Sequence, residues 1–395
     1  MTEKSAKPQL RFAGFDVTWE QRKLGELSKK TFGGGTPNTS NNEYWNGDIP
    51  WFQSSDISDG KLFDIAPKKF ISQDGLSKSA AQLIPENSIA IITRVGVGKL
   101  AFVPFSYTTS QDFLSLSRLK TEPFFTVYAC YKKLQSELNA VQGTSIKGIT
   151  KDELLAKQIM IPNYAEQRQI GAYFKSLDNL ITLHQRKYDK LTNVKKSMLE
   201  KMFPKNGSNV PEIRFKGFSD AWEQRKLVDV VDVRSGRDYK HLEEGDIPVY
   251  GTGGYMLSVN EALSDDEDAI GIGRKGTIDN PYILRAPFWT VDTLFYAVPR
   301  DKYDLNFVFD IFQNVNWKAK DESTGVPSLS KATINAVETL MPEYAEQKKI
   351  GEYFSYLDNF ITLHQCEFQM VSKRRKARLR RRAFEFTVIF ALIVL

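Results

Sequence analysis

The stretch "LDNLITLHQ" occupies Leu177–Gln185, and nearly the same nine residues, "LDNFITLHQ", occupy Leu357–Gln365. Each copy ends a longer repeated block, because Pro162–Gln185 matches Pro342–Gln365 at 17 of 24 positions. Internal repeats of this length indicate a duplicated architecture rather than a shared local propensity.

The repeated block is expected to form a long helix. Pro162 can stop a preceding strand, and Asn163 with Glu166 three residues later predicts an N-cap and its capping-box partner. Apolar residues then recur at alternating steps of four and three, which is typical of a coiled-coil seam, so we expect a helix over about residues 165–202. The seam residues are Ile170, Phe174, Leu177, Ile181, His184, Tyr188 and Leu191 in the first copy, and Ile350, Phe354, Leu357, Ile361 and His364 in the second.

Two of the three histidines, His184 and His364, fall on seam positions of these helices. We interpret them as buried polar residues that set the register of two packed helices, in preference to a catalytic or metal-binding role. No metal site is therefore expected.

A second pair of blocks precedes the variable regions: Pro8–Leu24 matches Pro211–Leu227 at 11 of 17 positions. Between the repeated blocks the two copies keep the same order of sequence features. Arg94 of the first copy corresponds to Arg274 of the second and Asp112 to Asp292, while most other residues differ. Conserved flanks around divergent interiors indicate two modules that do the same kind of job on different targets. Drift after duplication is the simpler alternative, but it does not explain flanks this similar.

The predicted fold class is α+β. Short β-rich runs such as "SIAIITRV" and "DFLSLSRL", with Gly/Pro/Asn loops and a helical patch near residues 126–138, indicate two mixed α/β modules. Two long antiparallel coiled-coil helices are expected to separate them, in a pseudo-two-fold duplication. The expected boundaries are 1–163 for the first module, 164–203 for the first spacer helix, 204–211 for a linker, 212–343 for the second module, 344–372 for the second spacer helix and 373–395 for an atypical tail.

Composition limits the possible classes of function. The 395 residues carry 54 basic and 48 acidic side chains, but eight of the basic ones lie in 373–382, so the global charge is no evidence for nucleic-acid binding. Two cysteines and three histidines exclude a disulfide scaffold, make a Cys/His zinc site improbable and fit a reducing cytoplasm best. The N-terminus lacks the apolar core of a signal peptide.

Sequence patterns that suggest catalysis are incomplete. "GIGRKG" at 271–276 has the glycine spacing of a dinucleotide site, but two prolines follow where that site requires a helix. "GVGKL" at 96–100 lacks the upstream glycine and the hydroxyl residue of a phosphate-binding loop. The chain is therefore expected to be a non-catalytic binding scaffold. A stand-alone methyltransferase or nuclease, and a coiled-coil adaptor that binds only protein, remain the competing hypotheses.

The motifs "WEQRKLGEL", "GGGTPNTSNNEYWNGDIPW", "GTSIKGIT" and "IPNYAEQRQIGAYFKSLDNLITLHQRK", in duplicated order over residues 8 to about 371, resemble those of specificity subunits of type I restriction–modification systems. The resemblance implies two target-recognition domains, each reading one part of a split double-stranded DNA site, held apart by the two helices. It also implies binding to two modification subunits and, through them, to restriction subunits. The cofactors S-adenosylmethionine, ATP and Mg²⁺ are then expected on those partners and none in this chain.

Base and phosphate contacts require Arg, Lys, Asn, Gln, small hydroxyl groups and free backbone amides, which selects candidates in each module. We expect Arg94→Ala to weaken binding of the target site far more than Lys29→Ala. The candidates are Gly33, Gly34, Gly35, Thr36, Asn38, Arg94, Lys99, Thr144, Ser145 and Lys147 in the first module, and Arg234, Arg237, Arg274, Lys275, Ser328, Ser330 and Lys331 in the second.

The C-terminal region departs from this pattern. The seam series meets Arg375 where an apolar residue is expected, and a basic run and "FTVIFALIVL" follow. Ten apolar residues are too few to cross a bilayer, so no membrane anchor is expected. We interpret 373–395 as an altered or fused end that leaves the distal spacer without a full partner.

Overall fold

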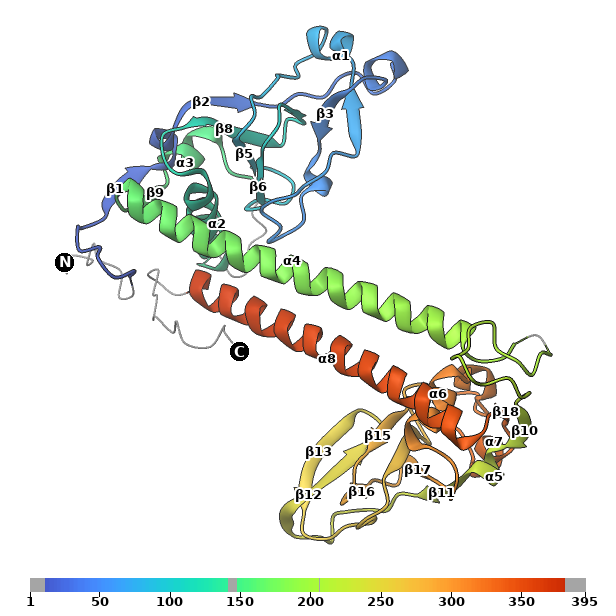
Figure 1. Ribbon diagram of the computed structural model, residues 1–395. Coiled ribbons are helices and arrows are strands. Elements are labelled where there is room, and N and C mark those ends of the chain that lie inside the picture. Colours follow the sequence, from blue (N-terminus) through green and yellow to red (C-terminus); the bar gives the residue numbers. More distant parts are fainter. Residues whose placement is uncertain (1–10, 141–147, 206, 381–395) are drawn as a thin grey trace. The chain divides into compact units, whose positions relative to one another are not determined.

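The computed structural model describes residues 11–140, 148–205 and 207–380. They form two compact units: unit 1 contains the described residues up to Leu183 together with those from Phe368 onward, and unit 2 contains His184–Glu367. The division falls inside both long helices, so each unit holds a mixed α/β module and one part of each helix (Figure 1).

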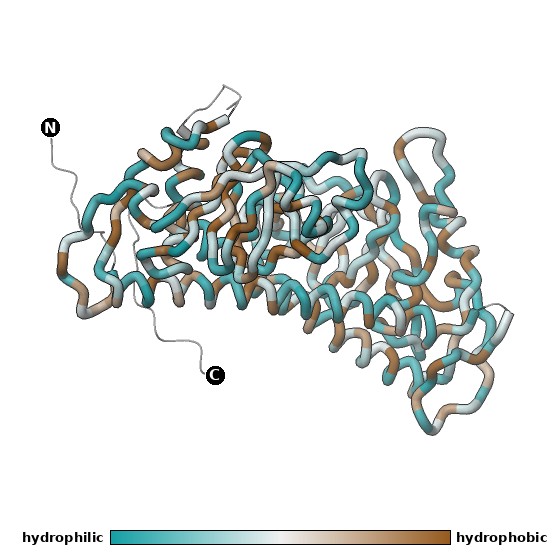
Figure 2. Tube along the Cα trace, turned by 90° about the horizontal axis from the view of Figure 1, so that it is seen from above, coloured by the Kyte–Doolittle hydropathy of each residue, from teal (hydrophilic) through white to brown (hydrophobic). Residues whose placement is uncertain are grey.

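The two long helices are α4, Tyr164–Lys201, and α8, Tyr344–Arg380. Ile170, Phe174 and Leu177 are buried in the core of unit 1, and Ile350 and Phe354 in the core of unit 2. The seam residues farther along each helix are half-buried, while most of their neighbours are exposed. Hydrophobic residues accordingly recur at intervals along helices that are otherwise hydrophilic (Figure 2). Of the helices within the described ranges, none combines the length and apolarity needed to cross a membrane.

Unit 1 contains a four-stranded sheet in the order β2-β8-β5-β6, a three-stranded sheet β4-β3-β7 and the pair β1-β9. Neighbouring strands are antiparallel except β3 and β7, which are parallel. The strands are β1 Glu20–Lys23, β2 Ser28–Gly33, β3 Ile49–Phe52, β4 Lys69–Ile71, β5 Ser88–Ile92, β6 Leu100–Val103, β7 Thr108–Thr109, β8 Phe113–Leu119 and β9 Gln158–Ile161. The short helices are η1 Leu24–Leu27, η2 Asn42–Trp45, η3 Ser54–Asp56, α1 Gln73–Ser77, α2 Pro123–Ala140 and α3 Lys151–Ala156.

Unit 2 repeats this plan with the sheets β11-β17-β14-β15, β13-β12-β16 and β10-β18. The strands are β10 Glu223–Lys226, β11 Val231–Ser235, β12 Glu244–Gly251, β13 Gly254–Val259, β14 Ala269–Gly273, β15 Tyr282–Leu284, β16 Trp289–Thr290, β17 Leu294–Pro299 and β18 Glu338–Met341. The short helices are α5 Leu227–Val230, α6 Leu305–Asn314, η4 Trp317–Lys320 and α7 Lys331–Asn335.

The start of each long helix is held by a buried ion pair. In unit 1 the Asn163 side chain accepts a hydrogen bond from the Glu166 amide at 2.9 Å, as expected of an N-cap. The Glu166 carboxylate, however, does not complete a capping box. It binds the guanidinium of Arg11 at 2.7 and 2.6 Å and is fully buried. The repeat places Arg214 on Glu346 in the same way in unit 2.

Glycine allows a close helix contact in both units. A Cβ at Gly171 of α4 would lie 2.4 Å from Glu122 Oε2 and 2.8 Å from the Phe125 amide, at the N-terminal end of α2. A Cβ at Gly351 of α8 would likewise lie 2.5 Å from Asp304 Oδ1, at the N-terminal end of α6. The helix backbones approach closely there because glycine has no side chain.

The conserved aspartate of the repeated nine residues binds a basic residue in each unit. In unit 2, Lys195 of α4 binds Asp358 of α8 at 2.5 Å. In unit 1, Asp178 of α4 pairs with Arg375 of α8, and it also accepts a hydrogen bond from Tyr128 at 2.7 Å. Lys195 and Arg375 are equivalent positions, because both stand at the same spacing from the repeated motif.

The expectation that the second spacer helix ends at 372 is wrong, since α8 continues to Arg380. Its distal part is packed: Leu379 belongs to the core of unit 1, and Val371 packs against that core. Arg375 occupies the seam because Asp178 neutralises its guanidinium while its aliphatic stem is buried. Residues 381–395 of the predicted tail lie outside the described residues.

One buried carboxyl makes unit 2 sensitive to pH. Asp310 of α6 is 1% exposed, and its Oδ2 has no hydrogen-bond partner among the described residues. Burial raises the pKa of Asp310 well above its ordinary value. The positive charge of Lys195 opposes this rise, and the negative charges of Asp358 and Asp304 add to it. The folded state therefore retains this proton to a higher pH than the unfolded state does, and stability falls as the pH rises above about 4.

We expect Asp310→Asn to stabilise unit 2 at pH 8, because asparagine keeps the shape of the side chain without a group that must be held protonated. The gain shrinks as the pH is lowered towards 4. Thermal unfolding of the two proteins at pH 5 and pH 8 measures this difference, with the exposed Asp301→Asn as the control. A stability difference between Asp310→Asn and wild type that is the same at both pH values contradicts the prediction.

Candidate nucleic-acid interface

Three strand ends meet at one end of the four-stranded sheet of unit 1. Because β2 and β5 are both antiparallel to β8, their C-terminal ends lie beside the N-terminal end of β8, with Gly33 opposite Leu114 and Ile92 opposite Phe113. We call this the loop end of unit 1 and define it as residues 33–36, 93–99, 109–112 and 148–150.

Hydrogen bonds join these segments into one surface. The Gly35 amide donates to Thr109 O at 2.8 Å, and the Thr36 hydroxyl donates to Gln111 Oε1 at 2.7 Å. The Thr93 amide donates to Asp112 O at 2.8 Å and the Ile149 amide to Thr93 O at 2.7 Å. The structure thus brings together segments that are separated by more than a hundred residues in the chain.

The glycines of this loop have different roles. A Cβ at Gly34 would lie 1.9 Å from Ser110 O, and one at Gly35 would lie 2.2 Å from the Ala80 carbonyl carbon, whereas Gly33 faces open space. Gly34 and Gly35 are therefore required for close backbone packing. Their role in this loop is to place the segment that follows them.

The polar candidates of unit 1 differ in how free their side chains are. Arg94 is exposed in the turn between β5 and β6, while Lys99 is half-buried. The Asn38 side chain accepts a hydrogen bond from the Ser40 amide at 3.0 Å, so its oxygen stabilises a turn. Three further candidates, Thr144, Ser145 and Lys147, lie outside the described residues.

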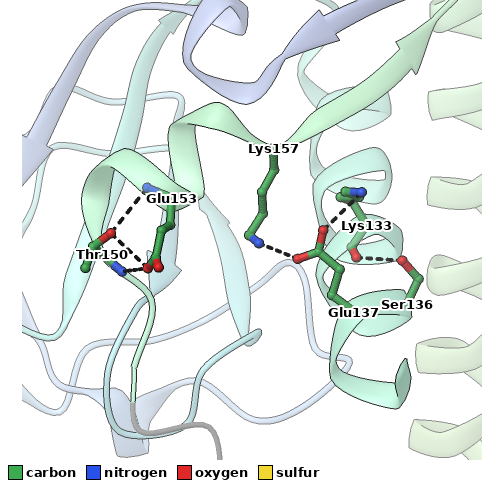
Figure 3. Close-up of polar contacts among 6 residues, drawn as sticks. All are labelled: Lys133, Ser136, Glu137, Thr150, Glu153 and Lys157. Atoms are coloured by element: carbon green, nitrogen blue, oxygen red, sulfur yellow. Dashed lines mark hydrogen bonds and ion pairs between the residues drawn. The ribbon is translucent and has the colours of Figure 1, made fainter. Parts of the chain in front are cut away.

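The chain that follows these three candidates is firmly anchored (Figure 3). Thr150 caps α3: its hydroxyl accepts from the Glu153 amide, and the Glu153 carboxylate accepts from the Thr150 amide at 2.8 Å. Beyond α3, Lys157 binds Glu137 of α2, which also binds Lys133 at 3.0 Å. Burial by itself raises the pKa of Glu137, but the hydrogen bonds from the two lysines outweigh it and lower that pKa. Glu137 is therefore ionised and ties α3 to α2.

The loop end of unit 2 is built from the equivalent strand ends of β11, β17 and β14. We define it as residues 235–238, 274–276, 290–293 and 327–331. The Arg237 amide donates to Thr290 O at 2.8 Å, the Arg274 amide to Thr293 O at 2.8 Å and the Leu329 amide to Arg274 O at 2.9 Å.

These contacts bring Arg237, Arg274 and Lys275 to one end of the sheet, and all three are exposed. The guanidinium carbon of Arg274 also lies 5.8 Å from the ring centroid of Phe295. A gathering of exposed guanidinium and ammonium groups is suited to bind phosphates and guanine edges.

Of the remaining candidates of unit 2, Arg234, Ser328 and Ser330 are engaged within the protein, and Lys331 is exposed. Arg234 binds Glu267 at 2.5 Å and Asp232 at 2.7 Å; these hydrogen bonds raise the pKa of Arg234 and neutralise its charge. Ser330 caps α7 by accepting from the Thr333 amide at 3.1 Å, while Lys331 is the exposed first residue of that helix. The Ser328 amide donates to Asp321.

The predicted correspondence between positions of the two units is wrong by one residue. It equated Arg94 with Arg274 and Asp112 with Asp292. Ile89 lies opposite Leu116 and Ile270 opposite Ala297, so the strands correspond at an offset of 181 rather than 180. Arg274 is therefore equivalent to Thr93, and Arg94 to Lys275. Strand pairing sets this register, and the counts of residues in the loops do not reveal it.

The sequence analysis did not select two residues, one in the loop end of unit 1 and one beside the loop end of unit 2. Gln111, exposed beside Thr36, carries an amide of the kind that reads adenine, but it stands in a run noted only for Asp112. Asp321 organises the loop of unit 2 by accepting from the Ser328 amide at 2.9 Å and the Ser323 amide at 3.0 Å, and these bonds lower its pKa. An aspartate directly before a Ser/Thr/Gly-rich stretch is typical of a turn, and this pattern could have indicated the role of Asp321.

Comparison with known proteins agrees with this architecture. Residues 16–193 and 219–370 match the family model described as "Type I restriction modification DNA specificity domain". The specificity subunit of the MjaIX type I restriction enzyme of Methanocaldococcus jannaschii is 25% identical over 240 residues, which are 57% of this chain and 54% of that protein. The MjaVIII specificity subunit of the same organism is 22% identical over 404 residues, covering 91% and 90%.

The match to MjaIX thus spans about half of that relative. Among solved structures, the type I restriction–modification S subunit of M. genitalium has a TM-score of 0.66 at 17% identity. The superposition covers 96% of this chain and 100% of that one, and it supports the fold.

Proposed function

The chain belongs to the family of type I restriction–modification DNA specificity domains, and from that premise we propose that its two loop ends each read one half of a bipartite, asymmetric DNA site. The observation that carries the proposal is the convergence of exposed basic side chains at the same end of the sheet in both units, accompanied by the Gln111 amide in unit 1, on backbones held by equivalent hydrogen bonds.

The differences between the two surfaces support two different half-sites. Where unit 1 has Gly35, unit 2 has Arg237, by the matching amide bonds to Thr109 O and Thr290 O. Arg274 stands at the position of Thr93, and Lys275 at that of Arg94. The two surfaces therefore offer different hydrogen-bond donors at corresponding points, and side-chain donors and acceptors specify bases in the grooves.

A scaffolding role is supported by the outer face of α8. Tyr356, Phe360 and Leu363 are 66%, 51% and 49% exposed and recur at steps of four and three residues, so they form one apolar stripe. Such a stripe fits an interface with another protein. In our proposal modification subunits dock on the helices and bring the restriction subunits, and those partners carry S-adenosylmethionine, ATP and Mg²⁺ while this chain catalyses nothing.

The domain scheme is part of the same proposal. The modules at 1–163 and 212–343 are the target-recognition domains, and the helices that follow them act as the coiled-coil spacer between the half-sites. The complex is expected to work in the cytoplasm.

Mapping methylated adenines in a host that carries this gene and its modification subunits identifies the site and its two halves. Electrophoretic mobility shifts of the assembled complex on that site then test the surfaces. We expect Arg94→Ala to weaken binding about tenfold or more, in line with about 1–3 kcal/mol for a good base contact, whereas Lys29→Ala has little effect. Lys29 is the matched control because it is exposed near the opposite end of β2.

The half-site assignment needs a second comparison. Arg94→Ala should relax specificity in one half of the site, and Arg237→Ala or Arg274→Ala in the other half. Unchanged binding by Arg94→Ala removes that residue from the interface. Loss of the same half-site by variants of both units contradicts the assignment of one half to each unit, and failure of the complex to bind any DNA favours a protein-only adaptor.

A further inference from the structure

Three side chains with metal-ligating atoms converge between the parts of α4 and α8 that belong to unit 2. They are His184 of α4 with His364 and Glu367 of α8. His184 Nδ1 lies 2.9 Å and His364 Nδ1 lies 3.3 Å from Glu367 Oε2, and the two Nδ1 atoms are 3.2 Å apart. The histidine side chains are each 13% exposed and the glutamate 34%, so a small ion can reach them from solvent.

Protons alone do not satisfy this triangle when the carboxylate is ionised. If both Nδ1 atoms carry a proton, two donors face each other at 3.2 Å. If only one Nδ1 atom carries a proton, the lone pair of the other Nδ1 atom faces the lone pairs of Glu367 Oε2, and the two acceptors repel each other. With the carboxylate ionised, each of these distributions of protons leaves at least one unfavourable contact, whereas a cation at the centre of the triangle satisfies all three atoms.

The distances fit a tetrahedral metal ion. Zinc bonds of about 2.0–2.1 Å to histidine nitrogen and carboxylate oxygen separate neighbouring ligand atoms by about 3.3–3.4 Å. The three observed separations, 2.9 to 3.3 Å, need only a small expansion to match. Imidazole and carboxylate are ligands that zinc accepts, and two histidines with one glutamate leave the fourth position to water.

We propose that His184, His364 and Glu367 bind one divalent transition metal ion, with Zn²⁺ as the best-fitting member of the class, and that the ion clamps α4 to α8 in unit 2. The clamp joins residues 180 positions apart in the chain, so it stabilises the folded state over the unfolded one. It adds a ligand role to the seam histidines, which the sequence presents only as register-setting residues.

Among the residues that the structure describes, this cluster occurs once in spite of the duplication. Both histidines come from the repeated "ITLHQ", but the residue equivalent to Glu367 in the first copy is Lys187, which cannot bind a cation. The glutamate is not a seam residue, and only the packing of the two helices places its oxygen against both imidazoles.

The experiment is a calorimetric titration of the purified full-length chain, stripped with chelator, with ZnCl₂. We expect one equivalent to bind, and the melting temperature to rise with zinc and fall again on adding chelator. His184→Ala and His364→Ala should each weaken zinc binding by more than about 100-fold, because even residues that only support ligands change affinity by about 10- to 100-fold. Glu367→Gln should weaken it by at least tenfold.

Matched controls separate this site from other zinc ligands. His241→Ala removes the third histidine, which is exposed, and should leave binding unchanged. Cys366→Ser removes the exposed thiol beside Glu367 and should also leave it unchanged. Cys130 is buried, and burial raises the pKa of its thiol to about 12, so it is no competing ligand. Equal zinc binding by wild type and His184→Ala, or loss of binding only in Cys366→Ser, overturns the proposal.

Should one of the three variants fail to fold, the visible spectrum of the wild-type chain with Co²⁺ provides an independent test. Tetrahedral nitrogen and oxygen ligation gives bands that Cys366→Ser retains. Their absence from the folded wild-type chain also overturns the proposal.

Discussion

Replacing Arg375 with methionine is expected to lower the free energy of unfolding of unit 1 by about 3–5 kcal/mol at pH 8. Arg375 binds Asp178, with side chains only 11% and 17% exposed, and it also donates to Gly60 O at 3.2 Å. Methionine fills much of the same volume but leaves the buried Asp178 with the Tyr128 hydrogen bond and the weaker attraction of Lys175. The cost is therefore that of an uncompensated buried carboxylate.

The pH dependence of this variant is a second expected result. Burial raises the pKa of Asp178, and Arg375 and Tyr128 oppose that rise. Removing Arg375 raises the folded-state pKa further, so the variant is stabilised where Asp178 is protonated and loses stability as the pH increases through that pKa. The deficit relative to wild type should thus be smaller at pH 5 than at pH 8.

Thermal and urea unfolding followed by circular dichroism at the two pH values measures both effects. Lys373→Met is the matched control, since it removes an exposed cation from the same helix. Equal effects of the two substitutions would mean that α8 beyond 372 contributes little to the folded unit, as the sequence alone suggested.

Glu346→Gln is expected to destabilise unit 2 by a similar amount, about 3–5 kcal/mol. The Glu346 side chain is fully buried and binds Arg214 through two hydrogen bonds of 2.7 and 2.8 Å. Arg214 also donates to Asp220 O, so it fastens the segment before β10 to the start of α8. Glutamine leaves the guanidinium buried without its counter-charge.

This loss should not vary between pH 5 and pH 8, because arginine cannot escape the penalty by losing its proton. That behaviour distinguishes it from Arg375→Met, in which the unpaired group is a carboxyl. The control is Glu223→Gln in the exposed Arg225–Glu223 pair, for which at most about 0.5 kcal/mol is expected. The same unfolding measurements apply. A loss from Glu346→Gln no larger than that of the control contradicts the buried-pair argument.

The repeat-level features were readable from the sequence because they depend on local periodicity and identity. The four-three spacing predicted a helix from about 165 to 202, and α4 runs from Tyr164 to Lys201. Asn163 was recognised as an N-cap because capping is a contact between near neighbours. The match to the family model agrees with the resemblance found in the motifs.

The partners of charged residues could not be predicted from the sequence. Glu166 stands where a capping-box glutamate is expected, yet its carboxylate binds Arg11, which is 155 positions away. Arg375 interrupts the apolar seam, and its partner Asp178 stands 197 positions away in the chain. Long-range ion pairs depend on how elements pack, and their spacing in the chain carries no signal of them.

The duplication, the long helices and the family resemblance follow from the order of the residues along the chain, because they depend on repeated residues and their period. Folding in three dimensions sets the one-residue register of the strands, which equates Arg274 with Thr93, and gathers distant loops at one end of each sheet. It also placed Glu367 against two histidines. The physical reason is that strand pairing and helix packing select contacts in three dimensions, where side chains far apart in the chain share one small volume.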